Sequence, residues 1–175
     1  AAYDDEDVSR LMADAGITDI LIATNLLGAA RSGSLANLQR RLPLKVCSDN
    51  VVSLSAYATC AQQANRVIDV VIECDTGQKR AGVETPNEAI KLIRRIHNDP
   101  WLQFAGLLYY PSRNGWYDVQ VFHDKMLSEL KKIGIAINIV STGGTPNFAH
   151  IGKLKGATEH RAGTCIFNDM MMVQN

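Results

Sequence analysis

The chain has 175 residues, and its 18 lysines and arginines balance 18 aspartates and glutamates. This length is sufficient for one domain with a hydrophobic core. No basic run indicates a nucleic-acid partner. No apolar stretch reaches membrane-spanning length and nothing at the start of the chain resembles a signal sequence, so we expect a cytoplasmic protein without a membrane partner.

The cysteines and histidines give no metal-site pattern. The four cysteines, at positions 47, 60, 74 and 165, form no Cys-x-x-Cys pair and lack zinc-site spacing. We therefore expect free, buried thiols in a reducing compartment. His97 and His123 are expected on exposed helix faces, and no metal ligands are assigned within this chain.

Short β-branched runs alternate with segments of helical period along the first half of the chain. Glycine and proline punctuate them, and Ser34 is expected to begin the second helix. The expected elements are a helix over 4–15, a strand over 19–23, a helix over 34–42, a strand over 44–48, a helix over 51–64 and a strand over 68–74.

The second half continues the alternation and opens on a clear helix start. Thr85-Pro-Asn-Glu88 is a capping box with proline at the first helical position. The expected elements after it are a helix from 86 with Ala89, Leu92, Ile93 and Ile96 inward, a strand over 103–110, a helix over 119–133, a strand over 136–140 and an extended segment over 158–167 with a kink near Gly163.

About six strands separated by helices predict an α/β fold with a parallel sheet. An open doubly wound sheet and a (β/α) barrel both fit this alternation. No strand is followed by a Gly-x-Gly-x-x-Gly turn, so a dinucleotide-binding fold has no positive support. A complete eight-stranded barrel needs roughly 200 to 250 residues, so this chain has about three-quarters of that length.

In either architecture the active face lies at the carboxyl ends of the strands. There, residues Ser141 to Pro146 place two glycines among three hydroxyl side chains, a composition suited to a phosphate-binding nest before a short helix. A plain tight turn remains the alternative interpretation. Arg80 lies in a glycine-bracketed loop and could orient an anion, although loop arginines are often only solvated.

Four segments resemble, in the same order, motifs of D-threonine aldolases and D-serine dehydratases in the alanine racemase group of fold-type III pyridoxal-phosphate enzymes. The resemblance covers nearly the whole chain. The segments are Glu73-Cys-Asp-Thr-Gly-Gln-Lys-Arg-Ala-Gly-Val83, Phe104-Ala-Gly-Leu-Leu-Tyr-Tyr-Pro111, Val140-Ser-Thr-Gly-Gly-Thr-Pro146 and Thr158-Glu-His-Arg-Ala-Gly-Thr-Cys-Ile-Phe-Asn-Asp169.

The resemblance implies a (β/α)8 TIM-type barrel, with about six βα units present over residues 1–175, that binds pyridoxal phosphate and assembles as a homodimer. It assigns catalytic roles to Arg80, near the cofactor's phenolic oxygen or the substrate carboxylate, and to Tyr110. Tyr110 or Arg161 would face the pyridine nitrogen. Thr142, Gly143, Gly144 and Thr145 would hold the phosphate together with the backbone of Gly163 and Thr164, and Ser141 belongs to the same cofactor-binding set.

The sequence also departs from the family pattern. No lysine matches the family's Schiff-base lysine, which the resemblance places upstream of Ala1. The resemblance places the family's divalent-metal ligands in a C-terminal β domain, which we do not expect within residues 1–175. Cys165 replaces a usual tyrosine, and His160 stands where apolar or aromatic residues are common.

The function implied by the resemblance is retro-aldol cleavage of a D-3-hydroxy amino acid, such as D-threonine, to glycine and an aldehyde. D-serine dehydration and amino-acid racemisation are alternatives within the same family. A non-enzymatic pyridoxal-phosphate carrier is an alternative of another class. Carriers usually have a phosphate loop rich in serine and methionine, which the Thr142-Gly-Gly-Thr145 loop does not resemble.

Overall fold

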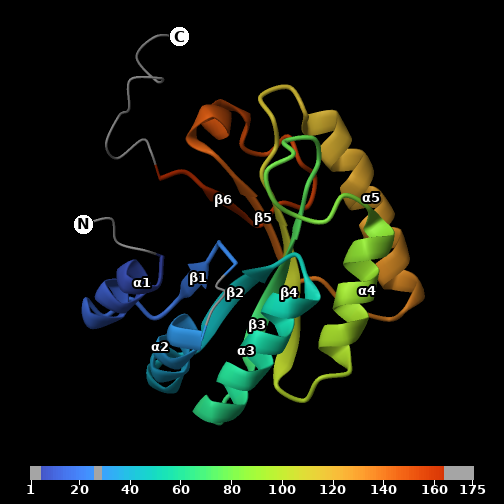
Figure 1. Ribbon diagram of the computed structural model, residues 1–175. Coiled ribbons are helices and arrows are strands. Elements are labelled where there is room, and N and C mark those ends of the chain that lie inside the picture. The colour runs from blue at the N-terminus through green and yellow to red at the C-terminus, as the bar shows by residue number, and fades with distance from the viewer. Residues whose placement is uncertain (1–4, 26–28, 164–175) are drawn as a thin grey trace. The chain divides into compact units, whose positions relative to one another are not determined.

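The computed structural model describes residues 5–25 and 29–163, in which helices and strands alternate (Figure 1). The elements are α1 (Asp5–Asp14), β1 (Ile20–Ile22), α2 (Ala29–Arg41), β2 (Leu44–Ser48), α3 (Val51–Ala64), β3 (Ile68–Cys74), α4 (Pro86–His97), β4 (Leu102–Tyr109), α5 (Trp116–Lys132), β5 (Ile139–Gly143), the 3₁₀ helix η1 (Thr145–His150) and β6 (Glu159–Arg161).

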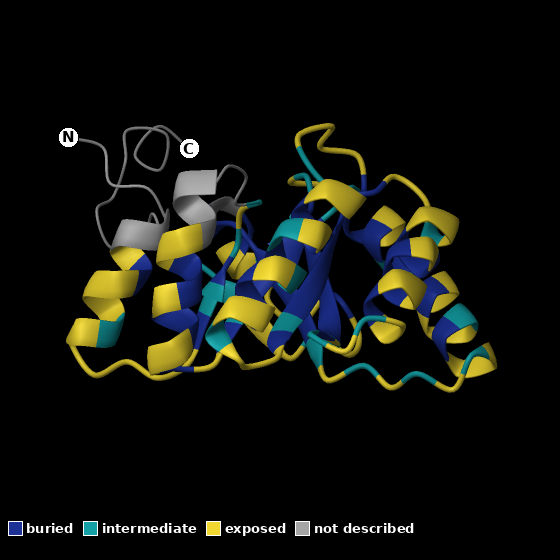
Figure 2. Cartoon of the chain, turned by 60° about the horizontal axis from the view of Figure 1, so that its bottom comes forward, coloured by how far each residue is buried: buried dark blue, intermediate teal, exposed yellow. Residues whose placement is uncertain are grey.

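The strands follow one another in the sheet in chain order, β1 to β6, and their recorded pairings are parallel. The strands β1 to β5 are buried along most of their length, as a parallel sheet covered by helices requires, whereas β6 is exposed or half-buried (Figure 2). The predicted α/β class with six parallel strands is therefore confirmed.

The chain divides into two compact units. The first comprises residues 1–72 and 91–105, and the second comprises residues 73–90 and 106–175. In the first unit α2 and α3 pack side by side (Figure 1). In the last turn of α2, the buried Gln39 side chain donates to the Val67 carbonyl at 2.7 Å and accepts from the Leu44 N–H at 2.8 Å, which joins the helix to β2.

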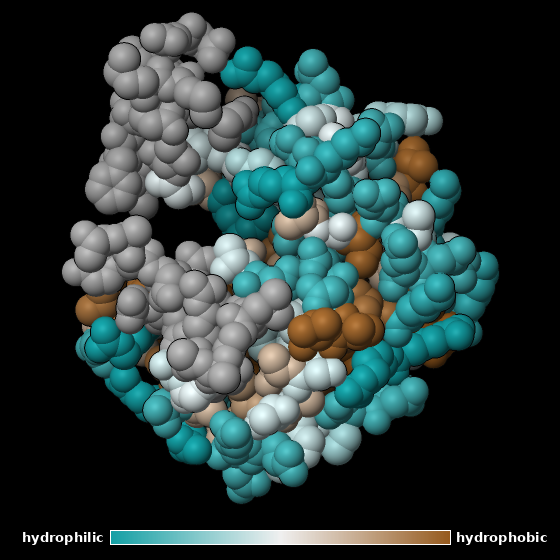
Figure 3. Space-filling view, in the orientation of Figure 1, coloured by the Kyte–Doolittle hydropathy of each residue, from teal (hydrophilic) through white to brown (hydrophobic). Residues whose placement is uncertain are grey.

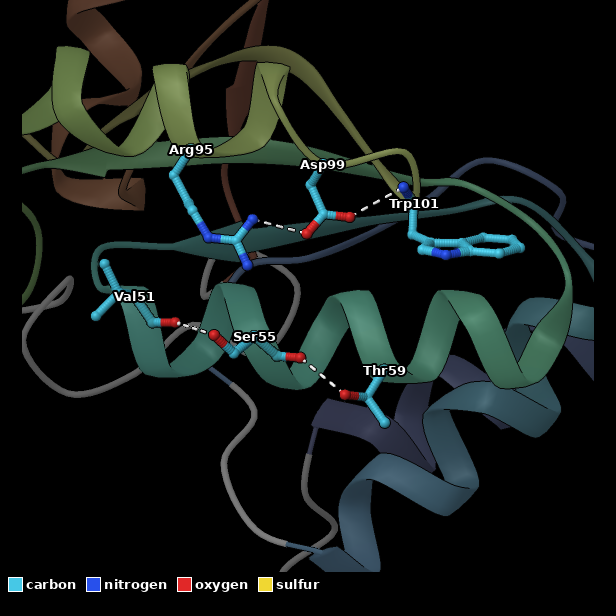
Figure 4. A network of polar contacts seen from close by, with 6 residues as sticks. All are labelled: Val51, Ser55, Thr59, Arg95, Asp99 and Trp101. Atoms are coloured by element: carbon cyan, nitrogen blue, oxygen red, sulfur yellow. Dashed lines mark hydrogen bonds and ion pairs between the residues drawn. The ribbon is translucent and has the colours of Figure 1, made fainter.

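Polar side chains define the helix ends in the first unit. The Asn50 side chain accepts the Ser53 N–H at 2.9 Å at the start of α3, and Asn65 ends that helix in the left-handed conformation with φ of 51°. After α4, the Asp99 carboxylate accepts from Arg95 at 2.7 Å and from the Trp101 N–H at 3.0 Å, which shapes the turn into β4 (Figure 4).

The capping box before α4 is confirmed. The Thr85 N–H donates to the Glu88 carboxylate at 2.9 Å, and the Glu88 N–H donates to the Thr85 hydroxyl at 3.3 Å. The predicted inward stripe Ala89, Leu92, Ile93 and Ile96 is buried. Local signals of this kind depend on a few neighbouring residues, and they locate the helix correctly.

Most boundaries agree with the sequence prediction to within a residue, but α2, α5 and β5 begin at least three residues away from it. α2 begins at Ala29, so Ser34 lies inside the helix and does not cap it, and α5 begins three residues early at Trp116. β5 lies over Ile139–Gly143 and not over 136–140, because Ile139 pairs with Gly106 and the polar end of the strand pairs with β6. Tertiary pairing therefore overrides the local apolar pattern.

The helix α1 exposes its apolar stripe: Val8 is 43% exposed and Leu11 50%. Elsewhere the face in Figure 3 shows mainly hydrophilic side chains with hydrophobic ones between them, as on most protein surfaces. Among the helices of residues 5–25 and 29–163, none combines the length and apolar content that a bilayer crossing needs.

In the second unit, β4 packs against α5 through a buried Tyr109–His123 pair. The Tyr109 hydroxyl lies 3.1 Å from His123 Nδ1, and the Phe122 ring meets Tyr109 edge-on. The prediction that His123 is exposed is wrong, since it is only 1% exposed. Burial lowers the pKa of His123, partly offset by Asp124, and burial raises the pKa of Tyr109 well above its ordinary value.

Replacing Thr85 by alanine removes the hydroxyl that caps α4. We expect this substitution to lower the free energy of unfolding by about 1 kcal/mol, as measured by urea denaturation. Thr59→Ala is the matched control, because the Thr59 hydroxyl only donates to Ser55 within α3 (Figure 4). Equal losses in the two variants would show that the box does not stabilise this helix.

The buried His123 predicts a pH-dependent stability. Its folded pKa is lowered, so the unfolded state binds more protons as the pH falls below the ordinary value of 6.5. The free energy of unfolding should therefore fall as the pH drops from about 7 to about 5, and His123→Gln should reduce that slope. The exposed His97→Gln controls for the loss of one imidazole. An unchanged slope in His123→Gln would contradict this account.

Candidate functional site

Residues with functional chemistry gather in the second unit, at the carboxyl ends of β4, β5 and β6. Tyr109, Gly143 and Arg161 are the last residues of these three strands. Because neighbouring parallel strands end at the same edge of a sheet, the side chains and loops that follow them lie close together. The predicted site residues of β4, β5 and β6 therefore lie at one edge of the sheet, and their binding role stays a prediction.

The Gly144 peptide groups are held on both sides. The Gly144 N–H donates to the Arg161 carbonyl at 2.9 Å, and the Gly144 carbonyl accepts the Asn147 N–H at 2.9 Å. The φ of Gly144 is 101°, a conformation that side-chain-bearing residues rarely adopt. Because its N–H is already bonded, Gly144 contributes space and chain direction to the turn, and not a free amide donor.

Thr145 directly follows this turn and carries the group best suited to a ligand. Its side chain is 4% exposed, and its hydroxyl has no hydrogen-bond partner. As the first residue of η1, it also has no intrahelical acceptor for its N–H. A buried hydroxyl without a partner is costly, so a bound anion that accepted its hydrogen would remove that cost.

Thr142 and Ser141 face opposite sides of β5, because successive side chains of a strand alternate. The Thr142 hydroxyl lies 2.9 Å from His160 Nδ1 and 3.3 Å from the Glu159 carbonyl oxygen, the two acceptors within reach of its single hydrogen. The Ser141 hydroxyl donates to the Glu159 carboxylate at 2.6 Å and accepts from Arg161. Both hydroxyls are therefore engaged within the protein, unlike that of Thr145.

The Arg161 guanidinium is fixed against the strand ends. Besides its hydrogen bond to Ser141, it donates to the Tyr109 carbonyl at 3.1 Å. A Cβ on Gly143 would lie 2.6 Å from Arg161 Nη2, so the guanidinium packs directly over that glycine. Gly143 therefore makes room for a positively charged group at the edge of the site.

Tyr110 connects the glycine turn to the Arg80 loop. A Cβ on Gly144 would lie 3.0 Å from the Tyr110 ring, and the Arg80 guanidinium carbon lies 4.9 Å from the centre of that ring. Its neighbour Tyr109 faces the other way and is buried under α5, because successive side chains of a strand alternate. Arg80 itself is exposed, and its stacking on Tyr110 is a cation–π contact.

The loops after β3, β4 and β5 meet at the Pro111 carbonyl. It accepts the Gln78 side-chain amide at 3.3 Å and that of Asn147 at 2.9 Å. Gly82, with φ of 108°, allows the β3 loop to return, because a Cβ there would lie 2.5 Å from the Asp75 nitrogen. The loop that carries Arg80 is therefore tied to the glycine turn.

The structure brings together six residues of the predicted site: Arg80, Tyr110, Gly143, Gly144, Thr145 and Arg161. The Thr142 hydroxyl lies on the side of β5 opposite to Ser141. The Ser141 hydroxyl supports Arg161. Gly163 is exposed, and Thr164 and Cys165 lie outside the described residues. Sequence reasoning did not assign Asn147, Pro111 or His160 to the site. Only His160 gave a signal, as a polar residue at a position where apolar ones are common.

The cysteines at 47, 60 and 74 are buried, as the sequence predicts. Burial, and then the adjacent Glu73, raises the pKa of the Cys74 thiol well above its ordinary value, so this thiol is not an activated nucleophile. Within residues 5–25 and 29–163 there is no group of three or more His, Cys, Asp or Glu side chains that could hold a metal ion.

Residues 11–170 match the family described as the alanine racemase N-terminal domain. The chain is 31% identical over 167 residues to a D-threonine aldolase from Arthrobacter sp. (89% of this chain, 44% of the relative). It is 28% identical to a D-threo-3-hydroxyaspartate dehydratase from Delftia sp. strain HT23 (90% of this chain, 45% of the relative).

A solved structure shows the same fold. The crystal structure of a D-threonine aldolase from Filomicrobium marinum superposes with a TM-score of 0.89 at 26% identity, covering 99% of this chain and 50% of that one. The expected TIM-barrel type of fold, present in part, is confirmed by this likeness. The chain spans about half the length of the curated relatives that it matches.

Proposed function

Because the chain belongs to the alanine racemase N-terminal domain family, we propose that it is the pyridoxal-phosphate-binding part of a lyase that cleaves a D-3-hydroxy amino acid. Curated relatives include an aldolase and a dehydratase for such substrates, which supports this class of enzyme. The activity of the whole protein is part of the proposal, since the chain covers 44% of the D-threonine aldolase.

The glycine turn fits the phosphate of the cofactor. The observation that carries the proposal is the buried, unpartnered Thr145 hydroxyl directly after Gly143 and Gly144. A phosphate oxygen is an acceptor that this hydroxyl and the Thr145 N–H would both bind. η1 has only six residues, so the support comes from these donors and from the space that the glycines leave, and not from a long helix dipole.

Arg161 and Tyr110 are suited to hold the ring. The guanidinium of Arg161 is already oriented by Ser141 and the Tyr109 carbonyl, so it would meet the pyridine nitrogen without further ordering. Tyr110 would lie beside the cofactor's pyridine ring, next to the glycine turn. Arg80, which is stacked on Tyr110, would meet the phenolic oxygen of the cofactor or the substrate carboxylate. Ser141 would act through Arg161, because its hydroxyl is already used by Glu159.

When bound, pyridoxal phosphate supplies the electron sink that makes cleavage of a bond at the amino acid's Cα accessible. In a retro-aldol reaction the Cα–Cβ bond breaks, the hydroxyl proton leaves and an aldehyde is released. The residues described here would bind and orient the reactants. A homodimer, a cytoplasmic location and a divalent metal held by residues outside this chain stay predictions.

Dehydration is the second candidate, because the D-threo-3-hydroxyaspartate dehydratase matches 90% of this chain at 28% identity. It releases water and then ammonia, leaving a 2-oxo acid, whereas the aldolase reaction conserves the amino group in glycine. Racemisation, the third possibility from the resemblance, would invert only Cα and so convert D-threonine to L-allo-threonine. The products therefore separate the three reactions.

We expect the full-length protein with pyridoxal phosphate and a divalent metal to convert D-threonine to glycine and an aldehyde. The measurement is product analysis by chromatography, with L-threonine as the matched substrate control. Appearance of a 2-oxo acid and ammonia would instead establish the dehydratase. If the cofactor binds and no amino acid is consumed, a non-enzymatic carrier becomes the correct account.

Thr145→Val keeps the shape of the side chain and removes its hydroxyl. A hydrogen bond to a charged group contributes about 1.5 to 3 kcal/mol, so we expect affinity for pyridoxal phosphate to fall by about tenfold to a hundredfold. Thr59→Val, at an exposed position of α3, is the matched control. Equal cofactor affinity in both variants, measured by absorbance titration, would remove the turn from the binding site.

A further inference from the structure

We propose that His160 is a positioning residue that sets the direction of the Thr145 N–H by holding the preceding peptide group from β6. The inference rests on the proposed function, because the peptide in question is the one that would bind the cofactor's phosphate. His160 would thereby act on the phosphate site through the Gly144 carbonyl, without touching the ligand itself.

The His160 ring joins two consecutive parts of the phosphate turn. Its Nδ1 lies 2.9 Å from the Thr142 hydroxyl, and its Nε2 lies 3.3 Å from the Gly144 carbonyl oxygen. A carbonyl oxygen only accepts, so Nε2 carries the hydrogen in this contact. The ring also meets Phe148 of η1 edge-on, with the ring centres 6.4 Å apart.

The carbonyl that His160 holds belongs to the same peptide unit as the Thr145 N–H. In a trans peptide the C=O and the N–H point in opposite directions from one plane, and the chain has no cis peptide bond among its described residues. A donor that holds the Gly144 carbonyl on one side therefore directs the Thr145 N–H to the other side, away from His160.

This peptide needs such a hold, because glycine restrains it weakly. Gly144 lies at φ of 101° and ψ of 123°, and without a Cβ it can reach alternative values at little cost. Rotation of the Gly144–Thr145 unit would replace a donor by a carbonyl oxygen at the anion site. The Asn147 N–H also holds this carbonyl, at 2.9 Å, so His160 is the second of two restraints.

Three substitutions of His160 distinguish the hydrogen bond made by Nδ1 from the one made by Nε2. Phenylalanine keeps an aromatic ring against Phe148 and makes neither hydrogen bond. Glutamine places an amide N–H near the position of Nε2, within reach of Gly144. Asparagine is shorter, so it reaches the partner of Nδ1, Thr142, and not the Gly144 carbonyl.

The test measures binding of pyridoxal phosphate and of pyridoxal, which lacks the phosphate, to the full-length protein by absorbance titration. Because one neutral hydrogen bond contributes about 0.5 to 1.5 kcal/mol, His160→Phe and His160→Asn should weaken pyridoxal phosphate binding about twofold to tenfold. Pyridoxal affinity should stay unchanged in both, and His160→Gln should retain most of the wild-type affinity for pyridoxal phosphate.

The controls distinguish a local effect from general damage. His97→Phe introduces the same change at an exposed site on α4 and should leave both affinities unchanged. If His160→Phe does not fold, the Asn and Gln variants still differ in the one contact that matters. Equal affinities in those two variants, or equal losses for pyridoxal phosphate and pyridoxal, would overturn the proposal. If the wild-type protein binds neither compound, the proposed function itself fails.

Discussion

The candidate site depends on the backbone around Gly144, whose N–H and carbonyl groups are already hydrogen-bonded within the protein. The amide of Gly144 bonds to β6, and its carbonyl bonds to η1 and to His160. With both sides of this residue occupied, the following Thr145 is left as the donor whose hydroxyl has no partner. The glycine turn is thus a support that orients the next residue, and only in part a binding surface.

The charged groups around the turn are likewise held by hydrogen bonds within the protein. Arg161 packs over Gly143 and bonds to Ser141, which in turn donates to Glu159. A guanidinium fixed in this way loses little conformational entropy when it meets a ligand, which is the physical basis of preorganised binding. Hydroxyl side chains near a glycine-rich turn therefore need not all be ligands, and here their partners separate their roles.

Sequence patterns of neighbouring residues allowed much of the fold to be predicted. The features that could not be predicted depend on pairings between segments that are distant in the sequence. The limits of β2, α3 and β3 and the capping box at Thr85 depend on neighbouring residues. The position of β5 depends on Gly106 and on β6, and the burial of His123 depends on Tyr109. The site's location followed from strand ends, but the separate roles of Ser141, Thr142 and Thr145 required the pairing of β5 with β6.

The Pro111 carbonyl, shared by Gln78 and Asn147, has a dynamic consequence. Proteins open locally in cooperative units. Because Gln78 and Asn147 bond to one carbonyl, a displacement of Pro111 would disturb both contacts. Fluctuations of the loop after β3 would then affect η1, although about seventy residues of chain separate Gln78 from Asn147. Amide hydrogen exchange in these two loops would be correlated, so that ordering one by a ligand slows exchange in the other.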